Sequence, residues 1–441
     1  MKKLSILFFL TASIFFSKAQ NASNPILSLD EAVGTAVKNN FNILMSRNDS
    51  ASFALDRSYA YAAFLPRVNG TFSKVWNINA QKQELANGQK RDTSGLRSNN
   101  LAAAVNLNWT VFDGMKMFAT RDRIMELEKL GALGVKAQVL ATVTAVSNNY
   151  FSIVRQKQQL KAIEEQMSIN EERVKLADKK LSVGLGAKPE LLQAKVDLNA
   201  QKAARLQQIT LIEQLKEQMN QLMAVPLTTQ YEVSDSIPIN YDLNFGSLQN
   251  GINSTNIGLL QAQKGIDIAK LSLKEREGEL FPTISLNTGY TLGRLKNKAV
   301  INSFTPLFNQ NLGFNYGVSM SIPIFNNFNT KRLIKQAKLD IQYQELNLKN
   351  LASQVDVQLS NAFKDYQLQL KSLALEEENI RLAKENMEIS LERFRQGVST
   401  FLELREVQKS LEDAYNRLIA ARYNTKLAEI QLLSLKGDLL K

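Results

Sequence analysis

The chain has 441 residues, a formal charge of +12, and neither cysteine nor histidine. The missing residue types exclude disulfides, thiol or imidazole catalysis, nearly all zinc sites and lipidation of an N-terminal cysteine. Lysine and arginine are interleaved with glutamate and aspartate, so the excess charge forms no basic block for nucleic acid, and we expect neither a metal nor a cofactor.

The first residues match a secretory signal peptide. Lys2 and Lys3 precede an apolar run over residues 4–16, and residues 17–19 form a small-x-small cleavage site. The run is too short to span a membrane as a helix, and we expect no later stretch with the roughly 20 apolar residues that spanning needs. Residues 1–19 are therefore predicted to be removed on export, and any segment in a membrane has to belong to a β-barrel.

A helix is predicted at the start of the mature chain, after a short polar segment. Its pattern opens at Leu29, with Ser28 as the N-cap and Glu31 at the capping-box position, and it stops at Pro66. Since proline has no N–H to donate, Pro66 marks the point where helix gives way to strand, and we assign Pro282 the same role later in the chain.

A β-hairpin is predicted over residues 66–112. Apolar and polar side chains alternate over 66–79 and again over 101–112, as in strands with one apolar and one polar face. Residues 80–100 between them are polar and contain glycine, which predicts a surface loop, and Asp113-Gly114 ends the second strand.

A helical pattern of unusual length follows, from about residue 115 to 181, and it would be roughly 100 Å long. Apolar residues recur in it at seven-residue spacing, which is typical of helices that pack side by side in coiled coils. A tip over 182–189 contains Gly184 and Gly186, and Pro189 opens another helix. The heptad positions are Ala132, Val139, Val146, Ile153, Leu160, Met167, Val174 and Leu181.

The same order of elements then recurs, which indicates an internal duplication. Phe281-Pro282 repeats Leu65-Pro66 at an offset of 216 residues, and the heptads and the tip glycine repeat at 213. The second heptad series is Ala352, Leu359, Tyr366, Leu373, Ile380, Met387 and Phe394. The predicted organisation is a first repeat over 20–224 (helix, hairpin, long helix, tip, helix), a connector over 225–245, and a second repeat over 246–441 with its hairpin at 282–325 and its tip at 395–400.

The clearest strand of the second hairpin is predicted from Leu312 to Phe325, with Asn315, Ser319 and Ser321 opposite its apolar row. Four strands per chain cannot close a barrel, but three chains would supply twelve, an even number as bacterial barrels have. A soluble β-sandwich face is the alternative for these strands. The side chains predicted to face lipid are Val105, Leu107, Trp109, Phe314, Tyr316, Val318 and Met320.

In this organisation the chain resembles the TolC-type outer-membrane factors, the exit ducts of Gram-negative efflux and secretion systems. The resemblance covers nearly the whole mature chain. It rests on the duplication, the two tips, Leu65-Pro66 and Phe281-Pro282 before the strands, and Val111-Phe112-Asp113-Gly114 and Ile324-Phe325-Asn326-Asn327 after them. It implies an α+β membrane protein: a homotrimer with a 12-stranded antiparallel barrel in outer-membrane lipid, continuous with a periplasmic α-helical barrel. A periplasmic adaptor protein and an inner-membrane transporter are the implied partners, docked at the tips.

The resemblance also implies an acidic ring at the entrance of the duct. Family members carry acidic residues six and nine positions past the second tip glycine, and Glu403 and Glu406 stand there after Gly397. Three chains would bring these carboxylates together, which favours cations. Glu190 holds the corresponding place in the first repeat, where the alternative role is to stabilise a helix N-terminus.

The tip turns and the latch are further expectations from the resemblance. Gly184, Gly186 and Gly397 are expected at the turns where an adaptor docks. Better-known members hold the closed tip with a tyrosine and an arginine, but Phe394 and Ser399 occupy those positions here. Closure in this chain is therefore expected to rely on packing and on other pairs.

The leading hypothesis is an outer-membrane duct that passively conducts substrates for an efflux pump or a type I secretion system, and no enzymatic reaction is expected. The alternative is a periplasmic coiled-coil scaffold or adhesin with a soluble β module, which would be extracted without detergent and would conduct no ions. Drug efflux, metal export and type I secretion share the duct, because the parts that select the cargo lie in the partner proteins.

Overall fold

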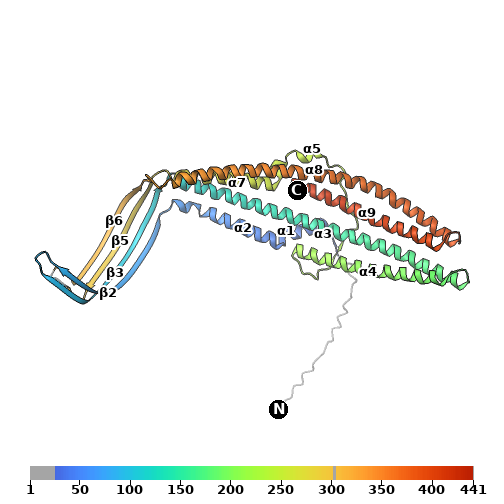
Figure 1. The fold of residues 1–441 in the computed structure, drawn as a ribbon, viewed down its shortest axis with the longest axis horizontal. Coiled ribbons are helices and arrows are strands. Elements are labelled where there is room, and N and C mark those ends of the chain that lie inside the picture. Colours follow the sequence, from blue (N-terminus) through green and yellow to red (C-terminus); the bar gives the residue numbers. More distant parts are fainter. Residues whose placement is uncertain (1–24, 301–303, 441) are drawn as a thin grey trace, which may run out of the picture. The chain divides into compact units, whose positions relative to one another are not determined.

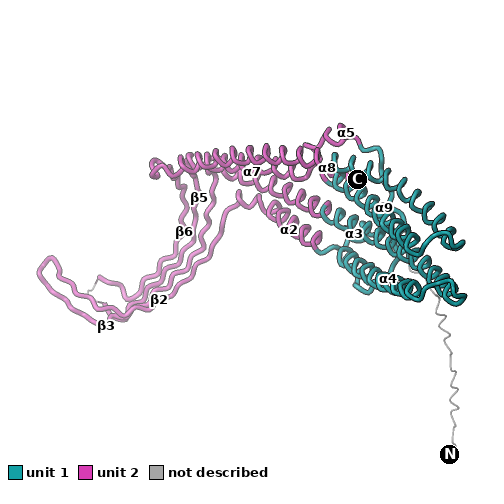
Figure 2. The backbone as a smooth tube through the Cα atoms, turned by 45° about the vertical axis from the view of Figure 1, so that its right-hand side comes forward, with its two compact units in different colours: residues 1–41, 141–243, 362–434 teal, residues 42–140, 244–361, 435–441 magenta. Residues whose placement is uncertain are grey.

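The structure is a computed structural model that describes residues 25–300 and 304–440. The predicted signal peptide lies outside these residues. The chain forms two compact units, one from residues up to 41, 141–243 and 362–434 and the other from residues 42–140, 244–361 and 435–441 (Figure 2). Each unit combines segments from both predicted repeats, and the repeat boundaries stay a prediction.

Four helices carry the internal duplication (Figure 1). Helices α3 (Lys116–Ser182) and α8 (Asn329–Arg395) have 67 residues each, and α4 (Lys188–Met223) and α9 (Phe401–Lys436) have 36 each. Helix α8 begins and ends 213 residues after α3, and α9 stands in the same relation to α4. The predicted long helices and their repeat are thus confirmed. Shorter helices in the second half of the chain are α5 (Phe245–Gln249), α6 (Ile252–Thr255), α7 (Ile257–Gly278) and a final 3-10 turn, η2 (Asp438–Leu440).

Four heptad residues of α8, Leu373, Ile380, Met387 and Phe394, form a core with α9 inside the first unit. Their side chains are almost completely buried, as the seven-residue spacing predicts. Packing of this apolar seam, and not helix propensity, provides most of the stability of such helices. The cluster comprises Leu373, Ile380, Met387, Phe394, Leu404, Leu411, Ala414, Leu418 and Ala421.

The prediction of one helix up to Pro66 is wrong. Helix α1 (Leu29–Asn39) opens with the predicted capping box, since the Glu31 N–H donates to the Ser28 hydroxyl at 3.2 Å and the Ser28 N–H to the Glu31 carboxylate at 3.0 Å. Asn40 then leaves the helical conformation, with φ of −57° and ψ of 127°, and its side-chain amide donates to the Leu222 carbonyl at 2.8 Å. The chain continues as α2 (Phe41–Ser58) and the 3-10 helix η1 (Ala60–Phe64). A tertiary hydrogen bond at Asn40 thus divides the helix.

One stretch of α3 is long and apolar enough to cross a membrane by length and composition alone. This differs from the expectation that nothing after the signal peptide reaches that threshold. Only 22% of the stretch is buried within the chain. A helix with an apolar packing seam passes the same test, so this stretch by itself does not place α3 in a membrane.

A four-stranded antiparallel sheet lies in the second unit. Its strands are β2 (Arg67–Glu84), β3 (Lys90–Phe112), β5 (Thr283–Asn297) and β6 (Phe308–Ser321), side by side in the order β2-β3-β5-β6 (Figure 1). In the described part of the chain the two outer strands, β2 and β6, each pair on one side only.

Strand boundaries differ from the prediction in both hairpins. Most of the predicted loop over 80–100 is strand, with Glu84 paired to Lys90 across a short turn. Both faces of this extension are polar, so it lacks the alternation that reveals a strand. Strand β6 ends at Ser321 and not at Phe325, because Pro323 has no N–H to donate to a neighbour.

The strand register gives the sheet one apolar and one polar face. Val105 pairs with Tyr290, which pairs with Phe314, and Leu107, Trp109, Tyr316, Val318 and Met320 lie at even spacing from these on the same face. Asn69, Asn106 and Asn315 lie on the opposite face, beside Gly289. All seven side chains predicted to face lipid therefore share one face.

A short parallel pairing holds the N-terminal segment in the first unit. Strand β1 (Ile26–Leu27) pairs with β4 (Glu232–Val233). The Glu232 carboxylate accepts a hydrogen bond from Lys216 at 2.8 Å and lies 3.2 Å from the Lys157 ammonium. Burial alone would raise the pKa of the Glu232 carboxyl, but the hydrogen bonds from Lys216 and Lys157 outweigh it and hold the pKa below its usual value.

The stability that Glu232 contributes should be lost on acidification. Because its pKa is lower in the folded protein, this contribution is present above the ordinary carboxyl pKa near 4.5 and is lost as the pH falls through the folded value. We expect Glu232→Gln to reduce this loss of stability at acid pH, measured as the melting temperature of the detergent-solubilised protein against pH. Glu217→Gln changes an exposed residue on α4, the helix that carries Lys216, and should leave the loss of stability at acid pH unchanged. Equal melting curves for the wild type and Glu232→Gln would contradict the assignment.

Candidate gate at the helix tips

Both tips close with the same backbone turn. Gly184 and Gly397 have φ of 82° and 76°, in the left-handed region that favours glycine. Gly186 is constrained by space instead, since a Cβ there would lie 2.8 Å from the Leu181 nitrogen. The hydrogen bonds run from Gly184 N–H to Leu181 C=O (3.0 Å), Leu185 to Lys180 (2.9 Å), Gly397 to Phe394 (3.1 Å) and Val398 to Arg393 (2.9 Å).

The two helices that leave the tips start differently. At α9 the Glu403 N–H donates to the Thr400 hydroxyl and the Thr400 N–H donates to the Glu403 carboxylate, both at 3.2 Å, which is a capping box. At α4 the N-cap is Ala187, whose side chain makes no capping hydrogen bond. Glu190 nevertheless lies in the first turn of α4, as its alternative role requires, and Glu403 lies in the first turn of α9 and also completes the capping box.

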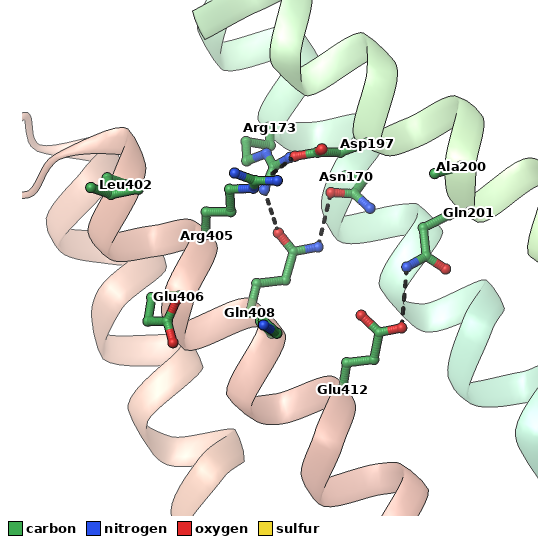
Figure 3. Close-up of a pocket in the computed structure, with 11 residues that line it drawn as sticks. Asn170, Arg173, Asp197, Ala200, Gln201, Leu402, Arg405, Glu406, Gln408 and Glu412 are labelled. Atoms are coloured by element: carbon green, nitrogen blue, oxygen red, sulfur yellow. Dashed lines mark hydrogen bonds and ion pairs between the residues drawn. The ribbon is translucent and has the colours of Figure 1, made fainter.

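A cavity of about 360 Å³ lies between α3, α4 and α9 in the first unit (Figure 3). Of the three predicted entrance residues, Glu406 lines it, while Glu190 and Glu403 do not. The structure of one chain thus does not bring the three carboxylates together. The lining residues are Asn170, Arg173, Asp197, Ala200, Gln201, Leu402, Arg405, Glu406, Gln408, Lys409 and Glu412.

The centre of this site is a buried arginine. Arg173 on α3 is 1% exposed, and its guanidinium donates to the side-chain oxygen Oε1 of Gln408 on α9 at 2.8 Å and to the Asp197 carboxylate on α4 (Figure 3). The Gln408 amide in turn donates to Asn170 at 2.9 Å. One cation therefore ties three helices together.

The charge of Arg173 is only partly compensated. Burial lowers the pKa of Arg173 below its usual value, the carboxylate of Asp197 opposes this, and the nearby Arg405 adds to the lowering. Its Nε has no hydrogen-bond partner among the described residues. Asn386 and Ser410 stand 213 residues after Arg173 and Asp197, so the second repeat does not copy this pair.

Further polar contacts join the two tip hairpins. The Lys180 ammonium donates to the Phe394 carbonyl at 3.2 Å and lies 3.7 Å above the Phe394 ring. Arg395 pairs with Glu172. These contacts connect α3 with α8 inside the first unit.

The latch-equivalent positions are occupied in a different way from the one the resemblance implies. Phe394 is 2% exposed and packs in the α8–α9 core while Lys180 covers its ring. Ser399 has a buried hydroxyl without a hydrogen-bond partner in the described residues. Lys180, Arg395 and Arg173 make polar contacts near the tip within one chain, and the way in which the tip closes stays a prediction.

Sequence reasoning missed the polar core around Arg173, although a signal was present. Gln166, Asn170 and Arg173 recur at the spacing of one helix face and run beside the apolar heptad. All three are buried, as is Gln408 across from them. A polar stripe next to a heptad seam is therefore worth treating as a candidate buried network.

Long paired helices, joined to a sheet with one apolar face and one face of small polar residues, define a subunit of an outer-membrane channel. Residues 32–225 and 252–438 match the model of the family described as outer membrane efflux protein, and the chain belongs to this family. The family is one of passive channels and not of enzymes. The protein is therefore an outer-membrane efflux channel of Gram-negative type.

Two relatives and one solved structure illustrate the similarity. The outer membrane protein TolC of Vibrio cholerae is 23% identical over 454 aligned residues, covering 100% of this chain and 96% of that protein. The outer membrane efflux protein BepC of Brucella suis is 22% identical, covering 93% and 85%. The structure of the Campylobacter jejuni CmeC outer membrane channel has a TM-score of 0.75 at 16% identity, covering 99% and 94%, which shows a shared fold. The scaffold or adhesin alternative has no support in these findings.

Proposed function

We propose that three copies of this chain form one passive exit duct, with twelve strands closed into an antiparallel barrel and the long helices forming a periplasmic tube. The open edges of β2 and β6 support this, because unpaired strand edges need a partner. Four strands cannot enclose a lumen, whereas three chains supply an even number that can. The apolar face of the sheet then contacts lipid, with Pro66 and Pro282 at the transitions from helix to strand.

The tips are the proposed docking surface for a periplasmic adaptor, which connects the duct to an inner-membrane transporter. Large apolar side chains are exposed there, next to the turn glycines Gly184, Gly186 and Gly397. Exposed apolar groups of this kind mark interaction sites. They are Val183, Leu185, Val398 and Leu402.

Transport through this duct requires no reaction in the chain itself. The transporter supplies the energy, and the duct conducts small molecules or secreted polypeptides to the exterior. The assembly is tested by the mass of the detergent-solubilised complex and by conductance in planar bilayers. A trimer with discrete conductance steps is expected, and a monomer without conductance would overturn the proposal.

We further assign the entrance ring to Glu403 and Glu406, with Glu190 beside them. Replacing Glu403 and Glu406 together by glutamine is expected to move the reversal potential in a salt gradient toward that of a nonselective pore, since the ring favours cations. Glutamine at position 403 can still complete the capping box with Thr400, so the change removes charge and keeps the helix start. Glu388→Gln, an exposed glutamate on α8, is the control; an unchanged potential in the double variant would sink the assignment.

A further inference from the structure

The apolar face of the sheet ends in a group of cations at the turn end of the hairpins. Lys74 on β2 and Arg294 on β5 both pair with Leu101, so they stand in one row across three strands. Trp76 and Lys296 both pair with Asn99 and form the next row on the same face. The side chains of all three cations are exposed. The strands thus gather three positive charges within two neighbouring rows.

The position of these rows follows from the length of the apolar band. On β5 the band runs from Ile284 to Leu292, whose partners on β6 are Met320 and Leu312. Nine residues match the roughly 9–11 that a tilted strand needs to cross the hydrocarbon. Arg294 comes two residues after the band. The cations therefore lie at the level of the lipid headgroups, where long basic side chains extend toward the phosphates.

The cations have no acidic partners on the sheet. The four strands contain two carboxylates, Glu84 and Asp92, both near the β2–β3 turn and paired with Lys90 and Lys82 at 3.5 and 2.8 Å. The three cations contact neutral groups instead. Lys74 lies 5.0 Å from the Trp76 ring, Lys296 lies 5.9 Å from the Phe308 ring, and Arg294 donates to Gln310 at 2.9 and 3.1 Å.

The opposite end of the same face carries no lysine or arginine. The rows nearest the helices contain Trp109, Leu286 and Val318, followed by Ile284 and Met320. One end of the band is thus cationic and the other is apolar. A membrane whose two leaflets differ in phosphate content matches this asymmetry, whereas a symmetric bilayer offers no reason for it.

We propose that Lys74, Arg294 and Lys296 bind the phosphate groups of a phosphorylated glycolipid headgroup in the outer leaflet of the membrane. The inference rests on the proposed function, which places the sheet in the membrane with the helices on the periplasmic side. Arg294 presents the planar donors that suit phosphate, and the two lysines add point charges, Lys74 in the same row and Lys296 in the next. The aromatic rings of Trp76 and Phe308 lie beside the cations at the same level, as in interfacial belts.

The test uses the full chain in neutral detergent micelles, titrated with diphosphoryl lipid A. Trp109→Phe leaves Trp76 as the single tryptophan and hence as a reporter beside Lys74. Each cation near an anionic surface is worth about a fivefold change in affinity, so Arg294→Gln with Lys296→Gln should weaken binding on the order of 25-fold. Lys82→Gln with Lys90→Gln removes the same charge near the turn and should change little. Arg294→Lys with Lys296→Arg keeps the charge and should retain most of the affinity.

The outcomes separate this inference from the proposed function. The inference alone is overturned if the wild type forms a conducting trimer, but Arg294→Gln with Lys296→Gln binds lipid A as tightly as Lys82→Gln with Lys90→Gln. Failure of the wild type to assemble or conduct overturns the proposed function. Inorganic phosphate should compete poorly; competition at concentrations equal to lipid A would indicate a site for a soluble anion and refute the assignment to lipid.

Discussion

Leu107→Arg is expected to remove most of the assembled protein from the outer membrane. Leu107 lies in the central row of the apolar band, with Thr288 and Tyr316 as its neighbours. A charged side chain on the lipid face of a barrel costs about 2–4 kcal/mol at the bilayer midplane, and each chain of a trimer would incur that cost. The amount of heat-modifiable protein in outer-membrane fractions measures the effect.

Asn106→Arg is the matched control, because it places the same side chain one residue earlier on the opposite face. Asn106 lies over Gly289, where an added Cβ would come within 2.7 Å of its side-chain oxygen, and it shares its row with Asn69. In the proposed barrel this face lines a water-filled lumen. Normal assembly with reduced cation conductance is expected. Equal loss of both variants would contradict the assignment of the two faces.

Arg173→Met is expected to loosen the tip hairpins strongly. The substitution leaves Asp197, which is 18% exposed, without its main cationic partner. It also removes the hydrogen bond that Arg173 donates to the side-chain oxygen of Gln408. Removing one partner of a buried ion pair costs about 3–5 kcal/mol. The free energy of local opening should fall by about this amount. It is measured by hydrogen exchange of peptides from the C-terminal end of α3 and the N-terminal end of α9.

Two further variants decide whether the ion pair is responsible. Arg173→Met combined with Asp197→Leu removes both charges, and such apolar replacements of buried pairs are often neutral, so much of the protection should return. Arg381→Met breaks a pair with Glu378 in which both side chains are more than half exposed, and it should leave the exchange nearly unchanged because water screens such a pair. Unchanged exchange in Arg173→Met would exclude a structural role for the network.

The long helices and the sheet follow closely from periodicity. Heptads predict α3 and α8 because the spacing of apolar residues is itself the packing surface, and Leu359, Leu373 and Met387 are buried as expected. The alternation of apolar and polar residues predicts β6 for the same reason, because only the face in contact with lipid or a protein core needs apolar side chains. Glycine at Gly184 and Gly397 marks the tips because the left-handed turn penalises other residues.

What the pattern cannot reveal depends on partners that are distant in sequence. The break at Asn40 needs the carbonyl of Leu222, and the network around Arg173 needs Gln408 and Asp197 from other helices. The extension of β2 and β3 is polar on both faces, so no alternation marks it. The entrance ring needs neighbouring chains, and for this reason Glu190, Glu403 and Glu406 remain apart in one chain.

The equal helix lengths constrain how this protein can change in size. The helix pairs match residue for residue, 67 with 67 and 36 with 36, whereas the strands have 18 and 23 residues in one hairpin and 15 and 14 in the other. Deleting one heptad from α3 alone would shorten it by about 10 Å and keep its packing seam intact. Such a chain would still pack, but its α3 would be seven residues shorter than α8. Deletions in the helices should therefore be tolerated only in pairs, while the hairpin loops accept changes singly.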